Sequence, residues 1–143
     1  MSQLKCHGAI EEIQDYIADN SGLGYSVGTN FVIGDIMDMA TLAATKAIDL
    51  SMYDEGAKME PSGRRWHMHR NIRFVFKGTF GQGAVNSGWK FVDWVGNQRV
   101  FDTTSYRVLW EGFPKLPSVI GATRAGTYLA DTVVSFRLLT KTG

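Results

Sequence analysis

The feature that most restricts the fold of this chain is a run of alternating side chains close to its C-terminal end. The two sets of side chains are Thr132, Val134, Phe136 and Leu138 on one side and Val133, Ser135, Arg137 and Leu139 on the other. Successive side chains of a β-strand point to opposite faces of its sheet, so a period of two residues predicts a strand. The second set is also partly apolar. The chain is therefore expected to fold around a β-sheet that contains this strand.

Other segments are predicted to supply the remaining strands. Ile48–Met52, Ile72–Phe76 and Tyr106–Glu111 also alternate between two sets of side chains, and Phe31–Ile33 is a short apolar run of the same composition. Each of the three longer segments has one face that is suitable for burial. Together with the C-terminal strand, they predict an antiparallel sheet joined by tight connections.

Glycine and proline mark the predicted ends of these strands. The strand at 72–76 is expected to end at Lys77-Gly78, and the strand at 106–111 is expected to end firmly at Gly112-Phe113-Pro114 and Pro117. Residues 121–126 are expected to form a polar connection. The segment Tyr53–Arg65 is predicted to be a loop, because it contains turn residues and few apolar anchors, and connections of that length are usually functional or mobile.

Two segments have the spacing of helices that bury one face. Ile10, Ile13 and Ile17 recur at helical spacing with acidic residues on the other side, and this helix is predicted to end at Asn20-Ser21-Gly22. A second apolar stripe runs through 84–95. The second helix is predicted to end at Gly96-Asn97, directly after the stripe.

The segment Met37–Lys46 contains strong helix formers with little polar contrast, and it is predicted to be a short helix or turn. The whole order of elements predicts an α+β fold, with an antiparallel sheet and helices packed on one face. Hydrophobic residues make up 44% and charged residues 20% of the 143 residues, which is typical of a folded globular chain. We therefore expect a single domain over 1–143.

Acidic and basic residues are distributed unevenly along the chain. Residues 1–60 contain ten acids and three bases, whereas residues 61–143 contain twelve bases and four acids. One interpretation is that the fold interleaves the two halves, so that the charges only solvate the surface. The other interpretation is that acidic and basic faces of different copies meet head to tail and close a ring.

His67-Met68-His69 is the one pattern that could chelate a metal ion, because alternate residues of a strand share a face. No third ligand is spaced around this pair, so the sequence predicts neither a metal site nor a cofactor. Catalysis is not expected either. The chain has no Gly-x-Ser-x-Gly elbow, no spaced partner for Cys6 or for the histidines, and no phosphate-binding loop.

A basic segment interleaved with aromatic residues runs from Arg64 to Lys77. Such a mixture is typical of nucleic-acid contact surfaces, but two of its aromatic residues, Phe74 and Phe76, occupy the face assigned to the core. We therefore expect a solvated or partner-facing basic patch and no specific nucleic-acid binding. The N-terminal residues lack the features of a secretory signal, and no apolar run is long enough to span a membrane, so a cytosolic product with no membrane partner is expected.

The order of these elements resembles the tail terminator, or minor capsid, subunits of long-tailed bacteriophages. The segments that carry the resemblance are the helix from Ile10 to Ile17, then AIDLSMYDEG, MHRNIRFVFKG, GAVNSGWKFVDWVGNQ, SYRVLWEGFP and AGTYLADTVVSFRLLT. In that family a strand ending in Arg or Lys and then Gly precedes a helix, and a Gly-rich segment leads into an aromatic turn before the last strand. Lys77-Gly78 and Gly126-Thr127-Tyr128 match those two places.

The resemblance implies a structural virion protein, made in the host cytoplasm, that caps the tail tube as a homo-oligomeric ring, usually a hexamer. In viral tail assembly such a ring ends polymerisation at the head-proximal end of the tail and provides the surface for head-tail joining. Its partners would be other copies of itself, the tail tube protein and a head-closure or neck protein. The residues expected at subunit or tail-tube contacts are Asp54, Glu55, Arg64, Arg65 and Arg70. A head-closure protein and a basic nucleic-acid-binding module stay as alternatives.

Overall fold

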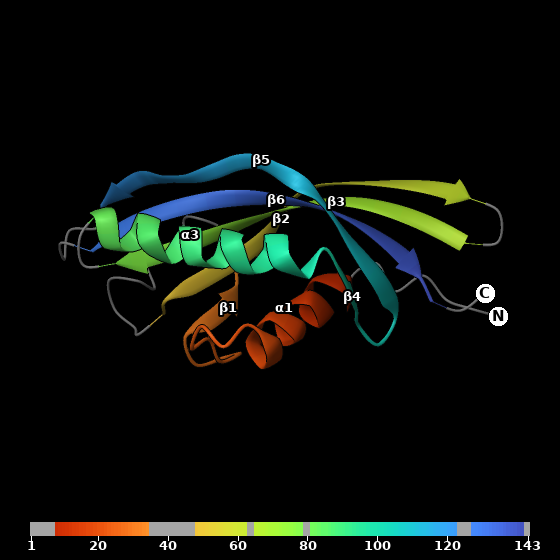
Figure 1. The fold of residues 1–143 in the computed structure, drawn as a ribbon, viewed down its shortest axis with the longest axis horizontal. Coiled ribbons are helices and arrows are strands. Elements are labelled where there is room, and N and C mark those ends of the chain that lie inside the picture. The colour runs from red at the N-terminus through yellow and green to blue at the C-terminus, as the bar shows by residue number, and fades with distance from the viewer. Residues whose placement is uncertain (1–7, 35–47, 63–64, 79–80, 123–126, 142–143) are drawn as a thin grey trace.

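A computed structural model describes residues 8–34, 48–62, 65–78, 81–122 and 127–141 (Figure 1). The chain forms two helices and six strands within these residues. In chain order they are α1 (Ala9–Asn20), β1 (Phe31–Ile33), β2 (Leu50–Ser62), β3 (Arg65–Gly78), α3 (Gly81–Gln98), β4 (Val100–Asp102), β5 (Tyr106–Ala122) and β6 (Tyr128–Thr140). The strands form one sheet in the order β1-β2-β3-β6-β5-β4.

The predicted α+β architecture is confirmed, with both helices packed on the same face of the sheet (Figure 1). The sheet is mixed, however, and not purely antiparallel, because β1 pairs with β2 in parallel. A parallel pair needs a crossover connection, whereas the sequence analysis assumed tight turns throughout. That connection contains residues 35–47, so the short helix or turn predicted at Met37–Lys46 lies outside the described residues.

One large apolar cluster lies between the helices and the sheet. Ile13 and Ile17 of α1 and Phe91 of α3 are fully or almost fully buried against Phe74 and Phe136 of the central strands. The Phe74 and Phe91 rings are 4.5 Å apart between centroids. Most residues of the predicted helical stripes and strand faces therefore form the core, but Trp89, which lies on the predicted stripe of α3, is exposed.

The two helices end differently. Helix α1 ends where predicted, and Gly22 follows it with the positive φ of +67° that favours glycine. The predicted end of α3 at Gly96-Asn97 is wrong, because α3 continues to Gln98 and the left-handed residue is Arg99, with a φ of +56°. The backbone oxygen of Arg99 accepts a hydrogen bond of 2.8 Å from Trp110 N, which fixes the end of α3 to β5.

The loop predicted at Tyr53–Arg65 is wrong, because β2 continues to Ser62 as one arm of a long hairpin with β3. The pairing extends from Leu50↔Phe76 to Ser62↔Arg65, with one register shift between Asp54 and Gly56. Backbone pairing along a hairpin does not require apolar side chains, and this arm projects beyond the end of the helical layer (Figure 1). The low apolar content of the segment therefore does not indicate a loop.

The predicted end of the strand at Gly112–Pro114 and Pro117 is also wrong, since β5 continues to Ala122. Strand β4, which the sequence analysis missed, pairs with β5 only at 107–109, so in the described part of the chain the outer edge of β5 has no strand beside it from 111 onwards. Proline is tolerated on such an edge because no ladder hydrogen bond is lost. Several register shifts, and the φ of +135° at Gly112, absorb the irregular backbone.

Candidate interaction site

Charged residues on β2, or directly before it, pair with charged residues of β3 across the hairpin. Asp49 lies 3.7 Å from Lys77, Asp54 lies 2.7 Å from Arg70, and Glu55 contacts Arg73. Each pair joins an acid of the acidic N-terminal half to a base of the basic C-terminal half. These six residues support the interleaved interpretation of the charge distribution, because neighbouring strands bring the two halves together.

The pair formed by Asp54 and Arg70 lies on the face of the sheet that carries the helices. Arg70 is only 7% exposed, and it has the same alternation as Ile72 and Phe74 of the core. Burial raises the pKa of the Asp54 carboxyl, and the charge of Arg70 and its hydrogen bond oppose this effect. The negative charge of Glu11 in α1 also raises this pKa slightly, because it disfavours ionisation of the Asp54 carboxyl.

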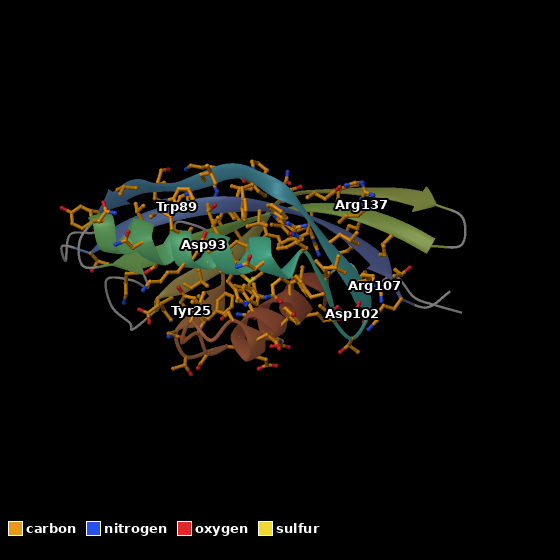
Figure 2. All side chains as sticks on the ribbon, in the orientation of Figure 1. Tyr25, Trp89, Asp93, Asp102, Arg107 and Arg137 are labelled. Carbon is orange, nitrogen blue, oxygen red and sulfur yellow. The ribbon has the colours of Figure 1, made fainter. Side chains whose placement is uncertain are left out.

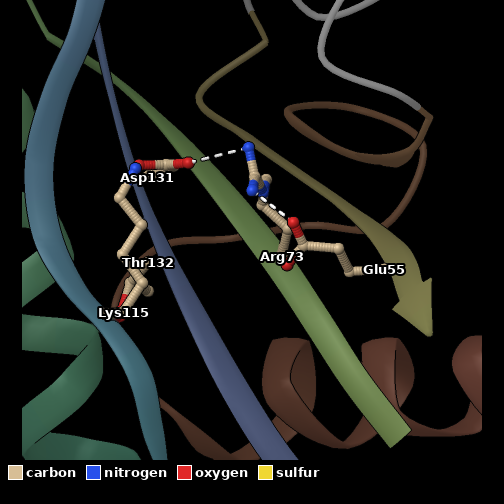
Figure 3. A network of polar contacts seen from close by, with 5 residues as sticks. All are labelled: Glu55, Arg73, Lys115, Asp131 and Thr132. Carbon is tan, nitrogen blue, oxygen red and sulfur yellow. Dashed lines mark hydrogen bonds and ion pairs between the residues drawn. The ribbon is translucent and has the colours of Figure 1, made fainter. Parts of the chain in front are cut away.

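Glu55 lies on the opposite face of the sheet, called here the far face, where Arg73 joins it to a larger network (Figure 3). Arg73 Nη1 is 3.1 Å from a carboxylate oxygen of Asp131, a residue with no exposed surface. The other oxygen of Asp131 contacts Lys115 Nζ, and the Thr132 hydroxyl donates to the Lys115 backbone oxygen over 2.6 Å. The network therefore links β2, β3, β6 and β5 across the far face.

A second cluster on the far face is centred on Glu111 of β5. One of its oxygens is 3.0 Å from Nδ1 of His69, and the other is 2.8 Å from Nη2 of Arg137, a residue labelled in Figure 2. His69 therefore uses one ring nitrogen within this cluster. Among the residues that the structure describes, no three His, Cys, Asp or Glu side chains are grouped so that they could hold a metal ion.

The predicted contact residues whose side chains the structure describes are Asp54, Glu55 and Arg70, and they lie on two different faces of the sheet. Asp54 and Arg70 pair with each other on the helix-bearing face, whereas Glu55 lies on the far face. Arg65 begins β3 opposite Ser62 near the end of the hairpin, and Arg64 lies outside the described residues.

The sequence analysis missed Asp131, Lys115 and Glu111. A usable signal was present for Asp131, because it is the one charged residue within the apolar run from Tyr128 to Phe136, and a buried charge in such a strand needs a partner.

Exposed apolar side chains gather at two places on the sheet edges. Leu116 and Val119 of β5 are 50% and 47% exposed, and Trp89 of α3 is 41% exposed. These residues flank the point where α3 touches β5, since a Cβ on Gly88 would lie 2.9 Å from Pro117 Cβ. We call Trp89, Leu116 and Val119 the β5 patch. At the opposite edge Val27 and Ile33 are 46% and 40% exposed, and we call these two residues the β1 patch.

No described helix is both long enough and apolar enough to cross a membrane. Comparison of the chain with protein-family models and with curated proteins finds no match in either set. A function for this chain is therefore proposed from its fold and from these surfaces.

Proposed function

We propose that this protein is a structural subunit of a long-tailed phage virion, a tail terminator that caps the tail tube as a ring. The role is non-catalytic. A hexameric ring would end tail polymerisation at the head-proximal end of the tail and present a surface to a head-closure or neck protein.

The observation that carries this proposal is the long β2–β3 hairpin, which projects past the helical layer at one end of the molecule (Figure 1). A thirteen-residue strand paired with a fourteen-residue strand is long for a domain of this size. Such an arm is suited to reach a neighbouring subunit or the tube below it. The hairpin also contains MHRNIRFVFKG and, from Leu50 onwards, AIDLSMYDEG, which are two segments of the family resemblance.

The pairing of charges supports a role in assembly more than one in chemistry. The carboxylates of Asp54, Glu55 and Asp131 each contact a basic side chain of the same molecule. A carboxylate held in this way stabilises the arrangement of strands, which a rigid ring subunit needs.

Interruption of the gene in the parent phage tests the proposal directly, with the lysate viewed by negative-stain electron microscopy. Tails of uncontrolled length beside filled, unattached heads are the expected result. Normal tails beside empty, leaking heads would replace the terminator role with head closure. Normal infectious particles would overturn the virion role altogether.

The predicted contacts of the hairpin are tested by charge reversal of Arg64 and Arg65 to Glu. We expect the reversed protein to fold but to complement the interrupted gene poorly. The matched control is Arg107→Glu, since Arg107 is an exposed arginine whose partner, Asp102, is also exposed. Full complementation by the Arg64→Glu, Arg65→Glu protein would remove these two residues from the interface.

A further inference from the structure

Helix α1 lies between the two edge strands of the sheet, β1 and β4, and it contacts the chain at both edges (Figure 1). On the β1 side, Gln14 donates a buried hydrogen bond of 3.1 Å to the backbone oxygen of Phe31. On the β4 side, Glu12 accepts a hydrogen bond of 2.7 Å from Ser105 N, in the turn between β4 and β5. One short helix therefore connects the two edges of the sheet.

The other contacts that hold α1 are made by its side chains. Ile13 and Ile17 are buried in the core, and the Tyr16 ring stacks on Phe101 of β4 with 4.0 Å between centroids. An α-helix pairs its backbone groups internally. The same helix from a second copy therefore fits this place without any change in the hydrogen-bond ladder of the sheet.

A short glycine segment joins α1 to the rest of the chain. Gly22 and Gly24 have φ angles of +67° and +89°, and a Cβ on either residue would meet nothing within 4 Å. The chain is fixed again just beyond, because Asn30 donates hydrogen bonds of 2.9 Å to Gly24 O and 3.0 Å to Asp49. The direction in which α1 leaves the body is therefore set by two glycines, and glycine changes its backbone conformation at little cost.

The described edges at β1 and β5 are poorly suited to pairing with a strand of another copy. At the β1 edge, Phe31 N already donates to Ser26 O over 3.2 Å, and Phe31 O accepts from Gly28 N over 3.0 Å. At the β5 edge, Pro114 and Pro117 have no N–H to donate, and the register against β6 shifts repeatedly. Prolines and bulges discourage strand addition. Copies that meet at these edges therefore need a contact other than an extended sheet.

We infer that α1 is exchanged between copies, so that the helix of one subunit occupies the place between β1 and β4 of its neighbour. The neighbour then receives the contacts that α1 makes within a single chain, including those of Gln14 with Phe31 and of Glu12 with Ser105. Exchange of an identical element is a low-cost route to association, and a contact passed from each subunit to the next closes a ring when the rotation allows it. The inference rests on the proposed ring and specifies the element that links its subunits.

The glycine segment provides the first test. Gly22→Ala strains the positive φ that the folded-back helix requires, and it adds no clash. The strain is relieved when the segment opens toward a neighbour, so the variant is expected to self-associate about fivefold more tightly, as measured by light scattering after size-exclusion chromatography. The matched control is Gly121→Ala, since Gly121 of β5 has equally open surroundings and no positive φ. Association of Gly22→Ala that is no tighter than that of the control would overturn the inference.

Crosslinking identifies the chain that supplies the helix, at a concentration at which the protein associates. In a Cys6→Ser background, Glu12→Cys with Ser105→Cys places one thiol on α1 and the other on the turn that α1 contacts. A short bis-maleimide is expected to join different chains and to give a ladder of oligomers. The control pair, Asp102→Cys with Arg107→Cys, lies within the β4–β5 hairpin and is expected to give monomers only.

Crosslinked monomers from the pair at Glu12 and Ser105 would overturn the inference, because α1 would then lie on its own chain. An equal ladder from the control pair would also overturn it, since the crosslinks would then not depend on α1. Uncontrolled tail length in the gene-interruption lysate, together with crosslinks within one chain, would remove the exchange and leave the terminator role intact. Failure of the terminator role is detected separately, by normal tails in that lysate.

Discussion

Asp131 is a carboxylate without exposed surface whose two oxygens face two cations from neighbouring strands. Because Asp131 lies on β6 and contacts side chains of β3 and β5, this one buried acid joins three strands on the far face. Removal of one member of a buried ion pair is costly, because the remaining charge stays out of water without compensation. Substitution of Asp131 should therefore lower the free energy of unfolding more than substitution of either of its more exposed partners.

We predict that Asp131→Asn destabilises the protein by about 2–4 kcal/mol, because Arg73 and Lys115 would lose the acid that they share. Equilibrium unfolding in urea measures the free energy. Asp102→Asn is the matched control, since Asp102 and Arg107 are both about half exposed, and exposed ion pairs contribute little to stability. Equal costs for the two variants would show that burial does not decide the strength of these pairs.

Tyr25 lies in the loop between α1 and β1, with its ring centroid 5.8 Å from that of Phe31. Burial, and to a smaller extent the charge of Asp49, raises the pKa of its hydroxyl to about 12. The unfolded chain ionises this group near pH 10, so its contribution to stability is fully present below pH 10 and is lost as the pH rises toward 12. The loss arises because the phenolate is favoured in the unfolded state.

We therefore predict that Tyr25→Phe flattens the alkaline pH dependence of stability. Between pH 10 and 11, the unchanged protein should lose roughly 1 kcal/mol more than the variant in urea unfolding. Tyr16→Phe is a control on the same side of the core, since Tyr16 stacks on Phe101 with 4.0 Å between centroids. If the stability of Tyr25→Phe and that of the unchanged protein depended on pH in the same way, folding would not raise the pKa of the Tyr25 hydroxyl.

At the scale of elements, the close approach of α3 to the sheet depends on missing side chains. A Cβ on Gly78, at the end of β3, would overlap the backbone of Ala84 and lie 2.8 Å from the carbonyl carbon of Gly83. Real Cβ atoms do not come that close to backbone, so the start of α3 would have to move. In contrast, a Cβ on Gly83 meets nothing within 4 Å.

We predict that Gly78→Ala destabilises the protein by about 2 kcal/mol or more, because the backbone cannot relax as a side chain can. Gly83→Ala, five residues away in α3, is expected to stabilise it by about 0.5–1 kcal/mol, since alanine is the better helix former. Thermal unfolding of the two variants should therefore shift in opposite directions. A shift in the same direction would mean that α3 is not held against β3 at this glycine.

The elements that could be predicted from the sequence are those whose burial is one-sided. The alternation at Ile72–Phe76 and the isoleucines of α1 identify their elements because the core imposes a period on them. The hairpin arm beyond Tyr53 and the second half of β5 could not be predicted, because their sequences lack a regular apolar alternation and only backbone pairing between distant segments reveals them as strands. The same reasoning explains the missed β4, which has only three residues with one buried side chain, Phe101.

The candidate surfaces were less predictable than the fold. The sequence shows that Asp54 and Arg70 are charged, but not that they face each other across a hairpin. The β5 patch has no sequence signature, because its residues come from α3 and from a segment that the prolines had marked as irregular. Only pairing between distant segments creates these surfaces.

At the scale of the whole molecule, the net charge of +1 hides an uneven distribution of charge along the sequence, and ion pairs among the described residues join its acidic and basic halves. Arg70 and Arg73 of the basic segment each contact an acid of β2, and Lys77 contacts Asp49, directly before β2. Lys115 and Arg137, further along the chain, contact Asp131 and Glu111. Affinity for nucleic acid depends on cations that are available to neutralise phosphates and release counterions. The pairing therefore argues against a nucleic-acid-binding module, even though the sequence of this segment is basic.

We predict that the purified protein binds duplex DNA weakly, with a slope of log affinity against log salt concentration of magnitude below about 2. Fluorescence anisotropy across a salt series measures the slope. The variant Asp49→Asn should bind more tightly and with a steeper slope, by up to about 1, because it removes the acid that opposes Lys77, whereas Arg73 would keep Asp131 even without Glu55. A steep slope for the unchanged protein would instead favour the nucleic-acid-binding alternative, since the cations would then have to leave their acidic partners for phosphate.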